Sequence, residues 1–126
     1  MKILLYAIRF VALILLVSGL NWILDPVDAA KQLGMPLLEG LGRSTQIGDF
    51  SAFFLAAGTM AAMGTYRGQT HWLYGSALLL GFAAIGRTLA AVVHGAPFAH
   101  WIAVELIGAV LLVAGARKLP EADAAN

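Results

Sequence analysis

The sequence predicts an all-α membrane protein, in which four transmembrane helices run up, down, up and down as a bundle. Three observations predict it. The 126-residue chain is 60% hydrophobic and only 12% charged, with a mean hydropathy of +0.83, whereas soluble domains are roughly half apolar. Four segments are long and apolar enough to cross a hydrocarbon layer of about 30 Å, which takes about 20 residues of helix. Most connections between them are short, and short connections make consecutive helices antiparallel neighbours.

The composition also excludes several classes of function. The formal net charge is +1, and the basic residues are scattered along the chain, so nothing resembles the basic patch that binds nucleic acid. The chain has no cysteine, which excludes disulfides, thiolate metal sites and thiol nucleophiles. We therefore expect the lipid bilayer, and no nucleic acid, as a partner.

The first predicted span covers residues 3–24 and follows Lys2. It resembles the start of a secretory signal, but Arg9 interrupts the apolar run and no A-x-A-like cleavage site follows. We therefore interpret it as a retained span, in which the Arg9 side chain extends back to the cytoplasmic head groups.

The connection after this span predicts a short interfacial helix at about residues 26–33. Asp25 is a typical N-cap and Pro26 suits the first helical position. Gly34 supplies a left-handed stop, and Pro36 prevents the helix from continuing. The segment is interpreted as a connector on the outer membrane surface, with a lid over the bundle mouth as the alternative.

Three further spans and a polar tail complete a single integral membrane domain at residues 1–126. The spans are residues 46–66, 72–93 and 98–116, and the tail is 117–126. Small residues recur in them at packing intervals: Gly48, Ala52 and Ala56; Gly58 and Ala62; Gly86 and Ala90. Such spacing lets helix backbones approach closely where lipid gives no hydrophobic drive between helices.

The basic residues predict the orientation of this bundle. Lys2, Arg67, and Arg117 with Lys118 all fall on one side of the membrane. The opposite side carries acidic residues beside its few basic ones. By the positive-inside rule, both termini are predicted to be cytoplasmic.

Three ionisable residues lie inside the predicted spans at similar depths in the outer half of the membrane, counting about 1.5 Å per helical residue. They are Asp49, Arg87 and Glu105, with Asn21 close to the same level. Arg87 cannot lose its charge, so it needs a carboxylate partner, and Glu105 and Asp49 are the candidates. Two interpretations stay open: a polar clamp that fixes helix register, or a pocket for a ligand or ion.

Residues near the outer turn are further candidates. His94 and His100 flank this turn and are weak candidates for metal binding, but no third ligand with a defined spacing accompanies them, so no metal site is predicted. Trp101 lies at the predicted interface, where aromatic belts occur, or lines the pocket. His94 and Glu105 are also the weak candidates for catalytic proton transfer.

These residues support three hypotheses of function. The first is a non-enzymatic membrane protein whose outward-facing polar pocket binds a small or lipid-like molecule, or which serves as a subunit of a homo-oligomer or larger membrane complex. The second is a membrane enzyme of the isomerase or oxidoreductase kind, acting on a hydrophobic substrate. The third is proton or ion passage, although no inverted repeat is visible. The sequence has no nucleophile triad or phosphate-binding glycine loop, and it names no cofactor.

One set of residues resembles a known family. Gly86-Arg87, then His94-Gly95-Ala96-Pro97, then Glu105 follow one another. With the small-residue-rich second span, this pattern resembles a family of small bacterial four-helix membrane proteins of unknown function, DoxX-like in general appearance. The resemblance implies four helices and the bacterial inner membrane, and it implies no activity. Such proteins often carry an acidic residue in place of His94, so no role is transferred to that position.

Overall fold

The computed structural model describes residues 1–66 and 69–119, and these residues form helices and their connections. The helices are α1 (Lys2–Leu24), α2 (Pro26–Gln32), α3 (Gly40–Met63), α4 (His71–His94) and α5 (Trp101–Lys118). No strand occurs within the described ranges, in agreement with the predicted all-α class. The predictions for Arg67 and for the tail beyond Leu119 concern residues outside these ranges.

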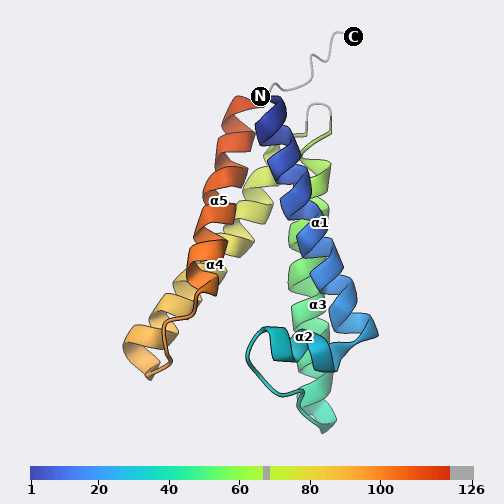
Figure 1. Cartoon of the computed structure of the whole chain (residues 1–126), viewed down its shortest axis with the longest axis vertical. Coiled ribbons are helices and arrows are strands. Elements are labelled where there is room, and N and C mark those ends of the chain that lie inside the picture. The colour runs from blue at the N-terminus through green and yellow to red at the C-terminus, as the bar shows by residue number, and fades with distance from the viewer. Residues whose placement is uncertain (67–68, 120–126) are drawn as a thin grey trace.

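The four long helices form two antiparallel pairs (Figure 1). α1 packs along α3 and α4 packs along α5, while the contacts of α3 with α4 and of α1 with α5 are less extensive. The pairs lie close together at the end of the molecule that holds the N-terminus and the end of α5. They diverge toward the opposite end, where α2 lies beside α1 and α3 (Figure 1).

Two hydrophobic clusters hold the helices together. The larger one joins all four long helices near the end where the pairs meet, and its buried members include Ile8, Ala12, Leu15, Ala57, Ala61, Leu73, Ala77, Leu80 and Leu112. The smaller one holds α2 against α1 and α3 and contains Trp22, Ala29 and Ala30. In it, the Trp22 ring stacks on Phe50 of α3 with their centroids 4.8 Å apart.

The short helix predicted after the first span is present as α2. Asp25 caps it, because its Oδ1 accepts a hydrogen bond of 3.2 Å from the backbone N–H of Asp28, and Pro26 occupies the first position. Gly34 follows the helix in the left-handed conformation, with φ of +78°. The capping residues of the sequence therefore set both ends of α2 as predicted.

The second long helix begins earlier than predicted, at Gly40 rather than at residue 46. Within its first turns, the buried amide of Gln46 folds back onto the preceding loop. Its Oε1 accepts from the backbone N–H of Leu38 at 2.8 Å, and its Nε2 donates to the carbonyl of Pro36 at 3.1 Å. These bonds hold the loop before α3 against the start of the helix.

Two helices of the described chain, α1 and α4, are long and apolar enough to cross a membrane. Only 22% of the most apolar window of each is buried, which differs from the largely enclosed core helix of a soluble protein. These two helices therefore support two of the four predicted spans, those at residues 3–24 and 72–93. α3 begins with polar residues, and the 18-residue α5 includes Glu105 and ends in Arg117 and Lys118. These polar and charged residues explain why α3 and α5 are less apolar than α1 and α4.

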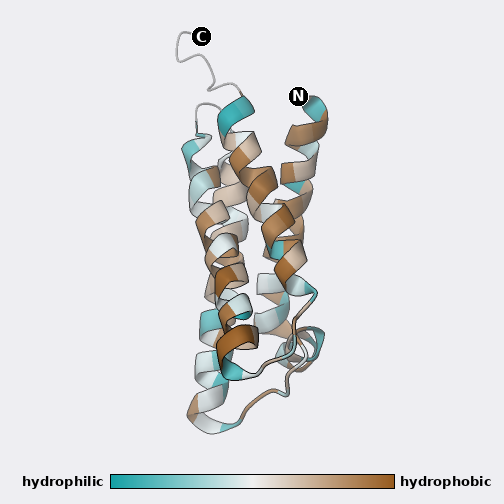
Figure 2. Ribbon diagram, turned by 90° about the vertical axis from the view of Figure 1, so that its left-hand side faces the viewer, coloured by the Kyte–Doolittle hydropathy of each residue, from teal (hydrophilic) through white to brown (hydrophobic). Residues whose placement is uncertain are grey.

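Many large apolar side chains on the long helices are exposed, and hydrophobic residues are spread along these helices (Figure 2). Examples from three helices are Leu13, Val17, Phe82, Val92 and Ile107, each more than half exposed. Apolar surface of this extent is typical of a protein that is covered by lipid or by another protein.

Glycines allow α1 and α3 to approach closely. A Cβ atom added at Gly58 would lie 2.9 Å from the backbone nitrogen of Leu16, and one added at Gly19 would lie 3.0 Å from that of Leu55. Backbone at this distance cannot move aside as a flexible side chain does. By contrast, Gly48 and Gly86 have open space around the same position, so only some of the small residues singled out in the sequence mediate helix contacts.

Replacing Gly58 by alanine is expected to lower the free energy of unfolding by about 1–3 kcal/mol, because the added methyl group overpacks the α1–α3 contact. The matched control is Gly48→Ala in the same helix, which is expected to leave stability unchanged or to raise it by up to about 1 kcal/mol. Unfolding in detergent micelles, followed by circular dichroism, measures both variants. Equal losses of stability would contradict a close contact at Gly58.

Candidate functional site

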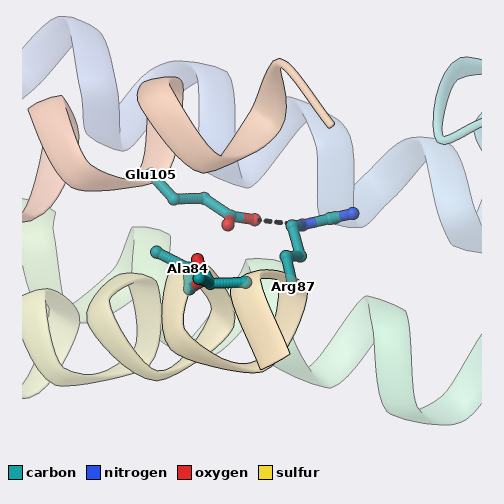
Figure 3. A network of polar contacts seen from close by, with 4 residues as sticks. Ala84, Arg87 and Glu105 are labelled. Carbon is teal, nitrogen blue, oxygen red and sulfur yellow. Dashed lines mark hydrogen bonds and ion pairs between the residues drawn. The ribbon is translucent and has the colours of Figure 1, made fainter. Parts of the chain in front are cut away.

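The centre of the candidate site is an ion pair between α4 and α5 (Figure 3). Arg87 Nε donates to Glu105 Oε1 over 2.9 Å. The two residues are 18 positions apart in the chain, and they meet because the short connection after His94 folds α5 back along α4. Of the two carboxylates that the sequence offered to Arg87, the structure brings Glu105 to it.

The two partners of this ion pair are buried to different degrees. Glu105 is 8% exposed, and its second carboxylate oxygen, Oε2, is buried without a hydrogen-bond partner among the described residues. The Arg87 side chain is 30% exposed. The pair is held through Nε alone, so within the described residues the terminal guanidinium nitrogens of Arg87 donate to no side chain or carbonyl.

A cavity of about 450 Å³ lies beside this ion pair, between the two helix pairs, and all five helices contribute to its wall. Apolar side chains form most of the wall, among them Val11, Leu15, Phe53, Phe54, Leu80 and Leu111. The polar lining residues are Ser18, Asn21, Gln32, Arg87, Trp101 and Glu105. An apolar hollow with a few converging polar groups is the usual form of a small-molecule site.

Two of the polar lining residues, Asn21 and Gln32, are joined through Asp28 at the junction of α1 and α2, and Asp28 itself does not line the cavity. Asp28 Oδ2 accepts hydrogen bonds from Asn21 Nδ2 at 3.0 Å and from Gln32 Nε2 at 2.7 Å. An ionised carboxylate only accepts hydrogen bonds, so both amides must turn their NH₂ groups toward it. Sequence reasoning found Asn21 but missed Asp28 and Gln32, although their spacing of four residues places them on one face of the short helix.

Asp49 does not belong to this site, contrary to the expectation that it joins Arg87 and Glu105. It is exposed on α3, does not line the cavity, and forms no salt bridge with any described residue. α3 turns its aromatic residues Phe50, Phe53 and Phe54 toward the interior instead. The helix pairs diverge toward the end of the molecule where α3 begins, which separates the first turns of α3 from α4 (Figure 1).

The two histidines lie outside the cavity. His94 is the exposed last residue of α4, and His100 is exposed beside Trp101, with their ring centroids 4.6 Å apart. Neither lines the cavity, whereas Trp101 does. The described chain has no group of three or more residues that could hold a metal ion.

Two other features involve α4: a buried hydrogen bond to α3 and a second hollow beside α5. The buried Ser76 hydroxyl donates to the carbonyl of Ala57 at 2.8 Å and so links α4 to α3. A second hollow, of about 460 Å³, lies between α4 and α5 and is lined almost entirely by apolar residues, such as Leu78, Phe82 and Val110. It lacks converging polar groups, so it does not compete with the cavity beside Arg87 as a specific site.

Removing one partner of the ion pair is expected to destabilise the fold more than removing both. Arg87→Ala leaves the Glu105 carboxylate buried without a counter-charge, at an expected loss on the order of 3 kcal/mol. Adding Glu105→Gln to that variant is expected to recover more than half of the loss. Denaturant unfolding in detergent measures both, with Arg9→Ala, an exposed residue of α1, as the control. A double variant no more stable than Arg87→Ala would contradict this account.

Comparison with known proteins adds no relative to these observations. No protein-family model, no curated protein and no solved structure matches the chain. The resemblance to small bacterial four-helix membrane proteins therefore stays a prediction, and the function is inferred from the geometry of the cavity.

Proposed function

We propose that this chain is a non-enzymatic integral membrane protein that binds a small or lipid-like molecule in the cavity between its two helix pairs. One observation carries the proposal. A mostly apolar cavity of about 450 Å³ holds, on its wall, an ion pair whose partners keep unused hydrogen-bonding groups. Intramembrane ionisable residues are costly and usually serve a function.

The form of the ion pair supports binding in addition to a structural role. An Arg–carboxylate pair that only joins two helices gains most from two parallel hydrogen bonds between the guanidinium and the carboxylate. Here a single bond joins Arg87 Nε to Glu105 Oε1. The pair links α4 to α5, and the other guanidinium nitrogens of Arg87, a residue of the cavity wall, donate to no described residue.

The membrane arrangement that goes with this function has four spans, α1, α3, α4 and α5, and places both chain ends in the cytoplasm of a bacterium. The N-terminus and the end of α5 lie at the same end of the molecule (Figure 1), and this end carries Lys2, Arg117 and Lys118. By the positive-inside rule that end faces the cytoplasm. The cavity and α2 then lie toward the outer face of the inner membrane.

No observation favours the enzyme or ion-passage hypotheses over binding. Proton transfer between Glu105 and His94 requires the two groups to share a site, but His94 is exposed and does not line the cavity. The accessory-subunit alternative is distinguished from ligand binding by whether another membrane protein or a small compound copurifies with the chain.

A bulky side chain on the cavity wall is expected to displace the bound molecule. Val104→Trp is expected to fill the cavity, whereas Val110→Trp places the same side chain on the same helix outside this cavity. Both valines are more than half exposed, at 52% and 68%. Native mass spectrometry of protein extracted directly from membranes is expected to reveal a bound compound in the wild type and in Val110→Trp, reduced at least about tenfold in Val104→Trp.

Thermal unfolding checks that both tryptophan variants are folded. Equal occupancy in the two variants would contradict binding in this cavity. Absence of any compound, together with stable copurification of another membrane protein, would favour the accessory-subunit function.

A further inference from the structure

The α4 side of the cavity offers hydrogen-bond donors. Arg87 uses Nε for Glu105, and its terminal nitrogens donate to no described residue. With 30% of its side chain exposed and the residue on the cavity wall, this guanidinium is accessible from the cavity. A ligand that fits this side carries an oxygen acceptor.

The opposite side, at the junction of α1 and α2, offers acceptors. Asn21 and Gln32 both donate their NH₂ groups to Asp28 Oδ2, at 3.0 and 2.7 Å. Their amide oxygens receive no hydrogen bond from the described residues, and both residues line the cavity. A ligand that fits this side carries a hydroxyl or N–H donor.

The charges around the cavity select against an ionic ligand. The charged side chains on its described wall are Arg87 and Glu105, which neutralise each other at 2.9 Å. The carboxylate of Asp28 does not line the cavity, and its Oδ2 accepts hydrogen bonds from the amides of Asn21 and Gln32. A carboxylate or phosphate would bring an unbalanced negative charge beside Glu105 into a mostly apolar space, and an ammonium group would bring a positive charge beside Arg87. Both are unfavourable, because an uncompensated charge is poorly stabilised away from water.

From these three observations we infer that the ligand is an uncharged lipid of the acylglycerol type. Its ester carbonyl accepts from Arg87, its hydroxyl groups donate to the amide oxygens of Asn21 and Gln32, and its acyl chain lies along the apolar wall that includes Phe53 and Leu111. This inference rests on the proposed binding function and adds to it the chemical class of the head group.

The test compares three probes that share an oleoyl chain. They are 1-monooleoylglycerol, its dimethyl ether, in which both hydroxyl groups are capped, and oleate, which is charged. Each is titrated against the full chain in phosphatidylcholine nanodiscs, and bound probe is counted by native mass spectrometry. We expect 1-monooleoylglycerol to bind at least about tenfold more tightly than either of the other probes, because the ether cannot donate to the amide oxygens of Asn21 and Gln32 and oleate adds a charge.

A double variant identifies the groups that recognise the hydroxyls. Asn21→Leu combined with Gln32→Leu removes both amide acceptors, and it is expected to bring the affinities for 1-monooleoylglycerol and its dimethyl ether within about threefold of each other. Gln69→Leu, at an exposed glutamine outside the cavity wall, is the matched control and is expected to retain the full preference.

Each contrary result has a distinct meaning. Oleate or the dimethyl ether binding as tightly as 1-monooleoylglycerol would overturn the inferred head group and leave the cavity's binding function in place. The inferred head group would also be overturned if none of the three probes bound although Val104→Trp still displaced a native compound. Failure of all three probes in a protein that carries no compound would overturn both the head group and the binding function.

Discussion

The fixed positive charge of Arg87 is the constraint on which the packing of α5 against α4 depends. A guanidinium cannot be neutralised by losing a proton, so in an apolar protein it must meet a carboxylate. Glu105 meets it at 2.9 Å from the neighbouring helix. Since the partners lie on α4 and α5, this contact fixes how far the second helix of the hairpin slides along the first. The position of every other α5 residue on the cavity wall follows from that register.

The cavity itself arises from the uneven distribution of side-chain size along the helices. Where the pairs meet, Gly115 lies against Ile8 and Leu73, and Gly64 also lies against Leu73, so the pairs approach closely. Toward α2, the interior positions carry large aromatic groups instead, with Phe53 and Phe54 in edge-to-face contact at 5.2 Å. Small residues at one end and large ones at the other hold the pairs in a V, and the open part of the V is the cavity.

Two carboxylates, Glu105 and Asp28, set which hydrogen-bonding groups remain unpaired around the cavity. By using Nε, Arg87 links α4 to α5, and its other nitrogens donate to no described residue. At the other side of the cavity, Asp28 orients two amides and exposes their oxygens. A carboxylate beside each group therefore sets the hydrogen-bonding character of each wall: donors on α4, acceptors at α1 and α2.

The sequence by itself determined the helical class, the α2 helix and the similar depth of Arg87 and Glu105 in one hairpin, because apolar runs, capping residues and a short connection are local and act between neighbours in the chain. The structure then decided that Arg87 pairs with Glu105 and not with Asp49. Tertiary structure alone decided that Asp49 lies outside the site, that Asn21 bonds Asp28 and that Gln46 holds the loop before α3. These outcomes depend on how each helix is rotated and on the angle between the two pairs. That angle results from packing between distant side chains, which no local pattern in the sequence records.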